Sequence, residues 1–206
     1  MVRRTKADAQ ATRTSILDAA EQVFERQGVS RSSLQDIASV AGVTRGAVYW
    51  HFQDKADVFN AMMERAKLPL EEAAQQLEAC TALSPLERLR QMLGIKLQRL
   101  ATDPQMQRVF TIATLKMEYV DELQAVQERY REAVNEHLAT IARALQRAGI
   151  DPHHAVGLHA LMLGLIHAWT LAPTSFDIAA DGGRAIDTHL AGLTAGKLAA
   201  AQMKAC

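Results

Sequence analysis

The segment LQDIASVAGVTRGAVYWHFQDK, residues 34–55, decides the fold of this 206-residue chain. A helix-turn-helix needs a small residue on its first helix, a glycine at the turn and a β-branched apolar residue that anchors its second helix. Ala38, Gly42 and Val48 meet these needs at offsets of four and six. The segment therefore predicts two short helices that cross closely at a glycine turn.

The other side chains of this segment divide into a small core and an exposed face. Thr44 is expected to cap the second helix, which begins near Arg45. The expected core consists of Leu34, Ile37, Val43 and Phe52, and the expected exposed set is Thr44, Arg45, Gly46, Tyr49, Trp50 and His51. An arginine near the start of such a helix can reach guanine O6 and N7, while tyrosine, histidine and Lys55 can donate to phosphates. The pattern favours DNA binding, and a plain three-helix scaffold is the alternative.

Helical patterns also flank this segment. Ile16, Ala20, Val23 and Phe24 share one face of a preceding helix that ends near Gly28. Ser32 and Gln35 have the spacing of a capping box at the next helix start. After Lys55 another helix begins, and Pro69 must start, end or kink it because proline lacks a backbone donor.

The rest of the chain predicts further amphipathic helices and no strands. They span about 70–80, 85–101, 104–118, 121–148, 152–172 and 182–203, between turns that contain proline or glycine. Residues 152–176 contain no Asp, Glu, Lys or Arg. A bilayer could accommodate that length, but its four histidines and its small residues favour a helix buried on most sides, in a core or a subunit interface.

Composition excludes several classes of protein. Lys+Arg and Asp+Glu both number 23, so the chain does not coat DNA by bulk charge, although it can still read a short site with a few side chains. Cys80 and Cys206 form no disulfide framework, and the basic amino terminus leads into no apolar run, so we expect a cytoplasmic protein. His159 and His167 lie about two turns apart without a third ligand, so no metal is expected. No catalytic constellation or cofactor loop is present, so we expect neither an enzyme nor a cofactor.

The run from Arg3 to Phe59, above all VTRGAVYWHFQDKADVF, resembles the amino-terminal domain of TetR-family transcriptional regulators. The resemblance implies an all-α fold, with a three-helix DNA-binding domain at residues 1–55 and a helical ligand-binding and dimerisation domain at 56–206, in which 56–68 form a connecting helix. It implies Thr44, Arg45 and Gly46 as base-proximal residues. It implies Ser33, Tyr49, Trp50, His51 and Lys55 as phosphate contacts or their supports. The arm with Arg3, Arg4 and Lys6 contacts DNA or is a disordered tail, and both readings stay open.

LKMEYVDEL at 115–123 and GLIHAWTLAPTSFDI at 164–178 resemble the AcrR and TtgR type, the subgroup that represses resistance-nodulation-division efflux operons. A metabolic or signalling operon is the alternative target. By position, the resemblance implies a ligand pocket of Met92, Leu93, Lys96, Phe110, Thr114, Met117, Val134, His159, Met162, Leu163 and Ile166. Glu118 is added because its carboxylate could attract a cationic drug, or could simply pair with Lys116.

The expected partners are a palindromic DNA operator, small hydrophobic or cationic inducers, and a second copy of the chain. Helices at about 152–172 and 182–203 would form the homodimer, because Gly157, Gly164, Gly192 and Gly196 permit close helix contact. The dimer would place two recognition helices one DNA turn, or a multiple of it, apart. Ligand binding would then favour a conformation with the wrong spacing.

Overall fold

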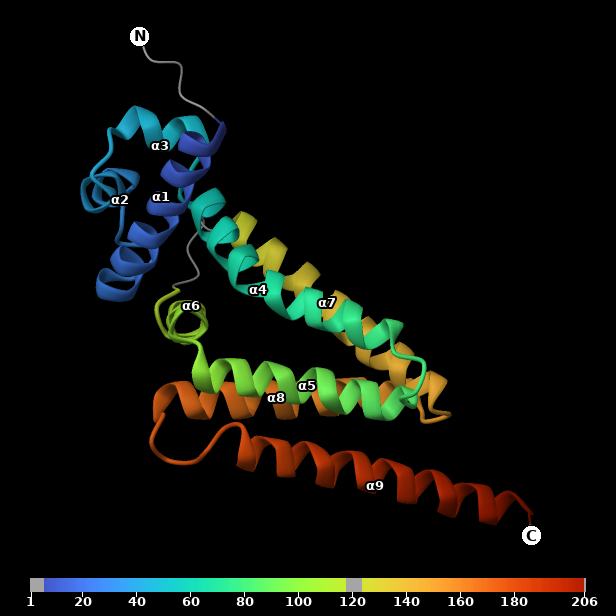
Figure 1. The fold of residues 1–206 in the computed structure, drawn as a ribbon. Coiled ribbons are helices and arrows are strands. Elements are labelled where there is room, and N and C mark those ends of the chain that lie inside the picture. Colours follow the sequence, from blue (N-terminus) through green and yellow to red (C-terminus); the bar gives the residue numbers. More distant parts are fainter. Residues whose placement is uncertain (1–5, 118–123, 206) are drawn as a thin grey trace. The chain divides into compact units, whose positions relative to one another are not determined.

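All regular structure in residues 6–117 and 124–205, the ranges that the computed structural model describes, is helical (Figure 1). The chain forms two units. Unit 1 comprises Met1–Lys67 and Gln105–Tyr130, and unit 2 comprises Leu68–Pro104 and Arg131–Cys206. In chain order the elements are α1 (Lys6–Gln27), α2 (Leu34–Ala41), α3 (Arg45–His51), α4 (Lys55–Ala79), α5 (Pro85–Thr102), α6 (Pro104–Leu115), α7 (Gln124–Arg147), the 3-10 helix η2 (Pro152–His154), α8 (Ala155–Leu171) and α9 (Ala180–Ala205). The all-α prediction is confirmed.

Side-chain caps define the helix-turn-helix of α2 and α3. The Ser33 hydroxyl accepts a hydrogen bond from the Asp36 backbone N–H, and the Asp36 carboxylate accepts one from the Ser33 N–H. The capping box therefore lies one residue beyond the predicted Ser32–Gln35 pair, and that prediction is wrong. Ser32 is buried, and its hydroxyl donates to the carbonyl oxygens of Gly28 and Val29 at 2.8 and 2.9 Å. It therefore closes the turn after α1.

The turn between α2 and α3 requires its glycine. Gly42 has φ +67°, the left-handed region, and its backbone N–H donates to carbonyls in the last turn of α2. Ala38 and Val48 are fully buried on either side of this turn, as their spacing predicted. The crossing of the two helices is thus fixed by small and β-branched side chains.

The core of unit 1 extends beyond the predicted DNA-binding domain. Val58 and Met62 of α4, Val109 and Ile112 of α6 and Val126 of α7 are buried in the same hydrophobic cluster as α1–α3. The unit therefore runs through the predicted boundary at residue 55 and takes in α6. The physical reason is that α6 buries its apolar face on this core.

Pro69 lies inside α4, which continues past it to Ala79. Proline has no N–H, so the carbonyl of Arg65, four residues earlier, has no intrahelical donor from this position. The predicted connecting helix and the predicted helix at 70–80 are therefore one element, interrupted in its hydrogen bonds near the change of unit at residue 67.

In unit 2, α5 and α8 both pack on α9, and α8 and α9 run side by side in opposite directions (Figure 1). A Cβ added at Gly182 would lie 2.6 Å from the Leu97 side chain, so glycine permits the close approach of α9 to α5. Arg90 of α5 donates through Nη2 to Asp187 of α9 at 2.7 Å. This ion pair lies at the exposed side of the contact between α5 and α9.

Much of α8 lies at the surface. The helical stretch Pro152–Leu171 is long and apolar enough to cross a membrane, yet only 22% of its most apolar window is buried. Val156, Leu163 and Leu171 are 63%, 47% and 59% exposed. Within one copy of the chain, therefore, α8 is not the helix buried on most sides that its composition predicted, and an interface role stays a prediction.

Candidate nucleic-acid interface and ligand cavity

The short helix α3 is anchored by one side chain and exposes the rest. The Thr44 hydroxyl accepts from the Ala47 N–H at 3.2 Å, which fixes the start of the helix. Val48 is the one buried residue of α3, whereas Tyr49 is 48% and Trp50 72% exposed. Large exposed aromatic side chains on a capped helix are typical of a surface that binds a partner.

Gly46 in the first turn of α3 has no packing reason to be glycine. A Cβ at this position would meet only the Thr44 hydroxyl, at 3.9 Å. Glycine inside a helix costs about 0.5–1 kcal/mol relative to alanine. The bare backbone therefore leaves room for close approach by something outside the chain.

Arg45 is held in one orientation by its neighbour one turn later. Its Nη2 donates to the Tyr49 hydroxyl at 3.0 Å, and its guanidinium lies 5.2 Å from the centroid of the Tyr49 ring. Such a contact at an exposed site contributes about 0.5–1 kcal/mol. The guanidinium is thus ordered at the surface, where both its charge and its remaining donors face solvent.

Ser33 and His51 lie at the ends of the helix-turn-helix. The Ser33 hydroxyl is exposed and donates to the Asp36 carboxylate at 2.7 Å, and this bond is the largest cause of the lowered pKa of Asp36. His51, in the last turn of α3, packs edge-on against Trp50, with 4.5 Å between ring centroids. The His51 ring therefore borders the exposed Trp50 ring.

Lys55 differs from the other predicted DNA contacts because it is buried. Its ammonium donates to the carbonyl oxygens of Ser30 and Ser32 at 2.8 and 3.0 Å, and its residue is 6% exposed. It therefore joins the start of α4 to the loop between α1 and α2. The geometry fits a support for the DNA-binding surface better than a phosphate contact.

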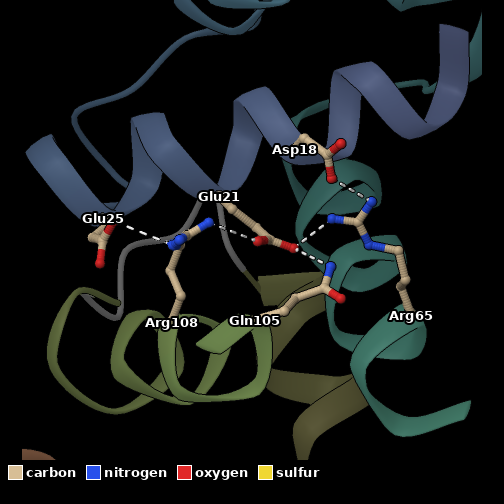
Figure 2. Close-up of polar contacts among 6 residues, drawn as sticks. All are labelled: Asp18, Glu21, Glu25, Arg65, Gln105 and Arg108. Atoms are coloured by element: carbon tan, nitrogen blue, oxygen red, sulfur yellow. Dashed lines mark hydrogen bonds and ion pairs between the residues drawn. The ribbon is translucent and has the colours of Figure 1, made fainter. Parts of the chain in front are cut away.

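A buried carboxylate that the sequence analysis missed connects three helices of unit 1. Glu21 of α1 is 2% exposed and accepts from Arg65 of α4 at 2.5 Å, from Gln105 of α6 at 2.9 Å and from Arg108 of α6 at 3.5 Å. Figure 2 shows these side chains converging from α4 and α6 on the α1 face. Asp18 pairs with Arg65 at 2.8 Å. We call these residues, together with Glu25, the Glu21 network.

The Glu21 network fixes α6 and the first part of α4 to α1. Glu25, the outer member, is 47% exposed and pairs with Arg108 at 3.4 Å. The carboxylates recur at spacings of three and four residues along α1, which indicates a single helix face. That spacing was the one available signal, and it is equally typical of a solvated face.

A second polar cluster lies in unit 2. Lys96 of α5 has its Nζ 3.4 Å from Nδ1 of His137 on α7, and the His137 ring lies 5.3 Å from the His159 ring on α8. Burial, followed by the nearby Lys96 and His159, lowers the pKa of His137 to about 3. Burial, then Lys96, lowers the pKa of His159. Both imidazoles are therefore neutral at pH 7, next to one ammonium group.

Unit 2 also contains a partly enclosed cavity of about 80 Å³, bounded by the C-terminal part of α4, the start of α5 and the C-terminal part of α7. Its lining residues are Ala74, Leu77, Pro85, Arg88, Leu89, Met92, Thr140, Arg143, Ala144 and Arg147. The cavity combines an apolar floor with three arginines. No arginine among these was predicted.

The predicted ligand residues are distributed over both units. Phe110, Thr114 and Met117 belong to unit 1, where Met117 packs against the core. In unit 2, Leu93, Met162 and Ile166 are buried, Met92 lines the cavity, Val134 is half-buried, Lys96 and His159 lie in the polar cluster, and Leu163 is 47% exposed. Glu118 lies outside the described residues, as do Arg3 and Arg4 of the arm.

No group of three or more His, Cys, Asp or Glu side chains suited to a metal ion occurs in the described ranges. His159 nonetheless has a buried Nδ1 atom without a hydrogen-bond partner in that part of the chain. The ring of His159 packs against that of His137 on α7, so this contact joins two helices.

Comparison with known proteins agrees with this geometry. Residues 16–62 match the family described as "Bacterial regulatory proteins, tetR family", and residues 84–194 match "MAATS-type transcriptional repressor, C-terminal region". The HTH-type transcriptional repressor BepR of Brucella suis is 39% identical over 94% of this chain and 97% of its own length.

Two solved structures share the fold closely. NalD, the secondary repressor of the MexAB-OprM multidrug efflux pump in Pseudomonas aeruginosa, is 36% identical, with a TM-score of 0.82 over 91% of this chain and 98% of that one. The SmeT–triclosan complex is 34% identical, with a TM-score of 0.79 over 89% and 91%; SmeT is the repressor of the Stenotrophomonas maltophilia multidrug efflux pump SmeDEF. With family matches over both segments and relatives along nearly its whole length, the chain belongs to the TetR family of bacterial transcriptional regulators.

Proposed function

We propose that this chain represses a multidrug efflux operon in the cytoplasm and leaves its operator when a small, largely hydrophobic ligand binds. The observation that carries the proposal is the exposed face of α3, with an ordered Arg45, a bare Gly46 and two exposed aromatic rings. NalD and SmeT, which are named as repressors of efflux pumps, support the choice of target.

On DNA, α3 would enter the major groove with Thr44, Arg45 and Gly46 next to base edges. Ser33, Tyr49, Trp50 and His51 would contact phosphates or pack along the DNA backbone. Lys55 would act indirectly, by holding the loop before α2 in place. Tyr49 would have two roles: it would contact the DNA backbone, and its ring and hydroxyl orient Arg45.

A second copy of the chain would cover the exposed face of α8. An open apolar surface there is lined by Ala160, Leu161, Gly164, Leu165, Ala168 and Phe176. Exposed apolar patches of this kind mark interaction sites, and a two-fold interface between α8 and α9 of two copies would bury it. A Cβ at Gly164 would touch nothing within 4 Å in one copy, so the surface has room for close helix contact.

This interface has a direct test. Gly164→Arg should leave the fold of the single chain intact and shift the protein from dimer to monomer in analytical ultracentrifugation. Gly94→Arg on α5, where a Cβ also meets nothing within 4 Å, is the matched control and should stay dimeric. A Gly164→Arg protein that remains a dimer would place the interface elsewhere.

Induction would act through the helices that continue from one unit to the other. The change of unit falls within α4, after the first residue of α6 and within α7. Because the Glu21 network joins α1 to α4 and α6, a ligand-dependent shift of either helix would move α1 with it. Only a ligand with different affinities for the two states can do this, and about 1–3 kcal/mol of such free-energy difference is typical.

A mobility-shift assay tests the proposal as a whole. The protein should bind its own upstream region specifically at physiological salt, and a panel of hydrophobic compounds that differ in charge should include compounds that release it. Absence of sequence-specific binding would refute the repressor role. Specific binding without any release by drugs, together with neighbouring genes that encode no transporter, would favour control of a metabolic or signalling operon.

A further inference from the structure

The residues that line the cavity of unit 2 indicate the charge of the ligand that it binds. This inference rests on the proposed function. The floor of the cavity is formed by Leu77, Leu89 and Met92 with small residues from α4 and α7. A volume of about 80 Å³ is roughly half of the 150 Å³ that holds a benzene ring in an engineered protein cavity. The space therefore fits the thickness of an alkyl chain better than a fused aromatic system.

The charged side chains around this floor all have one sign. Arg88 comes from α5, whereas Arg143 and Arg147 come from α7, and no Asp or Glu occurs among the described residues of the lining. Arg143 donates through Nη2 to the Thr140 hydroxyl at 3.1 Å, and that hydroxyl donates to the Glu136 carbonyl at 2.9 Å. These bonds orient the Arg143 guanidinium at the cavity.

Arg143 and Arg147 are also four residues apart on one helix face. Like charges at this spacing destabilise a helix by about 0.2–0.5 kcal/mol. An anion bound between them removes this repulsion and gains charge-assisted hydrogen bonds from planar donors that match an oxygen acid. A bound cation would add to the repulsion instead.

Two further polar side chains, one basic and one neutral, lie about one turn from the cavity lining. Lys96 lies one turn after Met92 on α5, and His137 lies one turn before Thr140 and Ile141 on α7. Burial and Lys96 keep His137 neutral at pH 7. The helices that line the cavity therefore also carry an ammonium group and a neutral imidazole about one turn from its lining residues.

We propose that this cavity binds a single-chain amphiphile with one anionic oxygen acid, held by the guanidinium groups of Arg143 and Arg147 and with its chain on the Leu77–Leu89–Met92 floor. The ligand class thus differs from the cationic drugs for which the sequence suggested Glu118.

Three probes with one chain and three head groups test the charge: octanoate, octan-1-ol and octylammonium. In isothermal titration calorimetry on the full-length protein at pH 7, octanoate should bind about tenfold or more tightly than octylammonium, with the alcohol between them. Equal affinities, or tighter binding of octylammonium, would overturn the inference.

Variants locate the site. Arg143→Glu should reverse the order of octanoate and octylammonium, whereas Arg131→Glu, at an exposed arginine of the same helix outside the cavity, should leave it unchanged. If Arg143→Glu does not fold, Arg143→Met should fold and lose the preference for octanoate. A preference that survives in both Arg143 variants would show that the anion binds elsewhere.

The operator assay separates this inference from the proposed function. Octanoate that binds with the expected preference but leaves the operator complex intact would support the cavity assignment and count against induction through it. Release by octylammonium and not by octanoate would overturn the inference and leave the repressor role in place.

Discussion

Replacing Glu21 by glutamine should be the most damaging single polar change in unit 1. The glutamine has nearly the same shape, but it removes the charge that faces Arg65 and Arg108 and leaves the amide N–H₂ group directed at their donors. Removing one partner of a buried ion pair costs about 3–5 kcal/mol. Here Asp18 still pairs with Arg65 at 2.8 Å and Glu25 with Arg108 at 3.4 Å, so part of the loss is compensated and about 2–3 kcal/mol is expected.

Chemical denaturation followed by circular dichroism measures this loss. For a chain of this size, 2–3 kcal/mol corresponds to a decrease in Tm of about 4–12 °C. Glu25→Gln is the matched control on the same helix face: its carboxylate is 47% exposed, and exposed ion pairs contribute at most about 1 kcal/mol. If the two variants lose equal stability, the Glu21 network is not the buried anchor that its geometry indicates.

The remaining predictions concern DNA binding and pH. Lys55→Met should lower stability by about 1–3 kcal/mol, because one half-buried and one buried carbonyl lose the ammonium donor. It should leave the salt dependence of operator affinity unchanged; a slope reduced by about one unit would show a phosphate contact. Arg45→Ala should cost about 1–3 kcal/mol at one operator position, whereas equal losses on every DNA sequence would reassign it to the backbone. Tyr49→Phe should weaken the same discrimination, measured with the same operator variants, since Arg45 loses its acceptor; unchanged discrimination would show that this hydrogen bond is dispensable. Because the pKa of His137 is lowered to about 3, the unfolded chain binds a proton between about pH 6.5 and 3 that the folded chain does not bind. The free energy of unfolding therefore decreases as the pH falls through this window, by up to about 1.4 kcal/mol per pH unit. In His137→Leu, the plot of the free energy of unfolding against pH should lose up to this much slope.

The helix-turn-helix was predictable because its requirements are local. Ala38, Gly42 and Val48 satisfy a crossing whose geometry is fixed by sterics within eleven residues, and the structure buries or bends each as expected. The error at Ser32 has an equally local cause. Ser32 and Ser33 each have a polar residue three positions on, and only tertiary context, in which the Ser32 side chain turns to the end of α1, decides between them.

The Glu21 network and the cavity were not predictable from the same evidence. The sequence around Glu21 predicts an exposed side chain, because acidic residues every three or four positions usually indicate a solvated helix face. Its burial depends on Arg65, Gln105 and Arg108, which lie 44, 84 and 87 residues away in the chain. The arginines of the cavity likewise have the spacing of ordinary surface positions on α5 and α7.

The structure also changes what Pro69 implies. Arg65 binds Glu21 through its guanidinium, and its own carbonyl is the one that Pro69 deprives of a helical donor. Arg65, which pairs with α1, and Pro69, which lacks the N–H for the Arg65 carbonyl, therefore belong to the same turn of α4. This turn lies next to the change of unit at residue 67. A helix bends most easily where such a bond is missing. The part of α4 before this turn is thus held to unit 1, and a ligand-dependent bend of α4 would concentrate just after it, because there the backbone resists least.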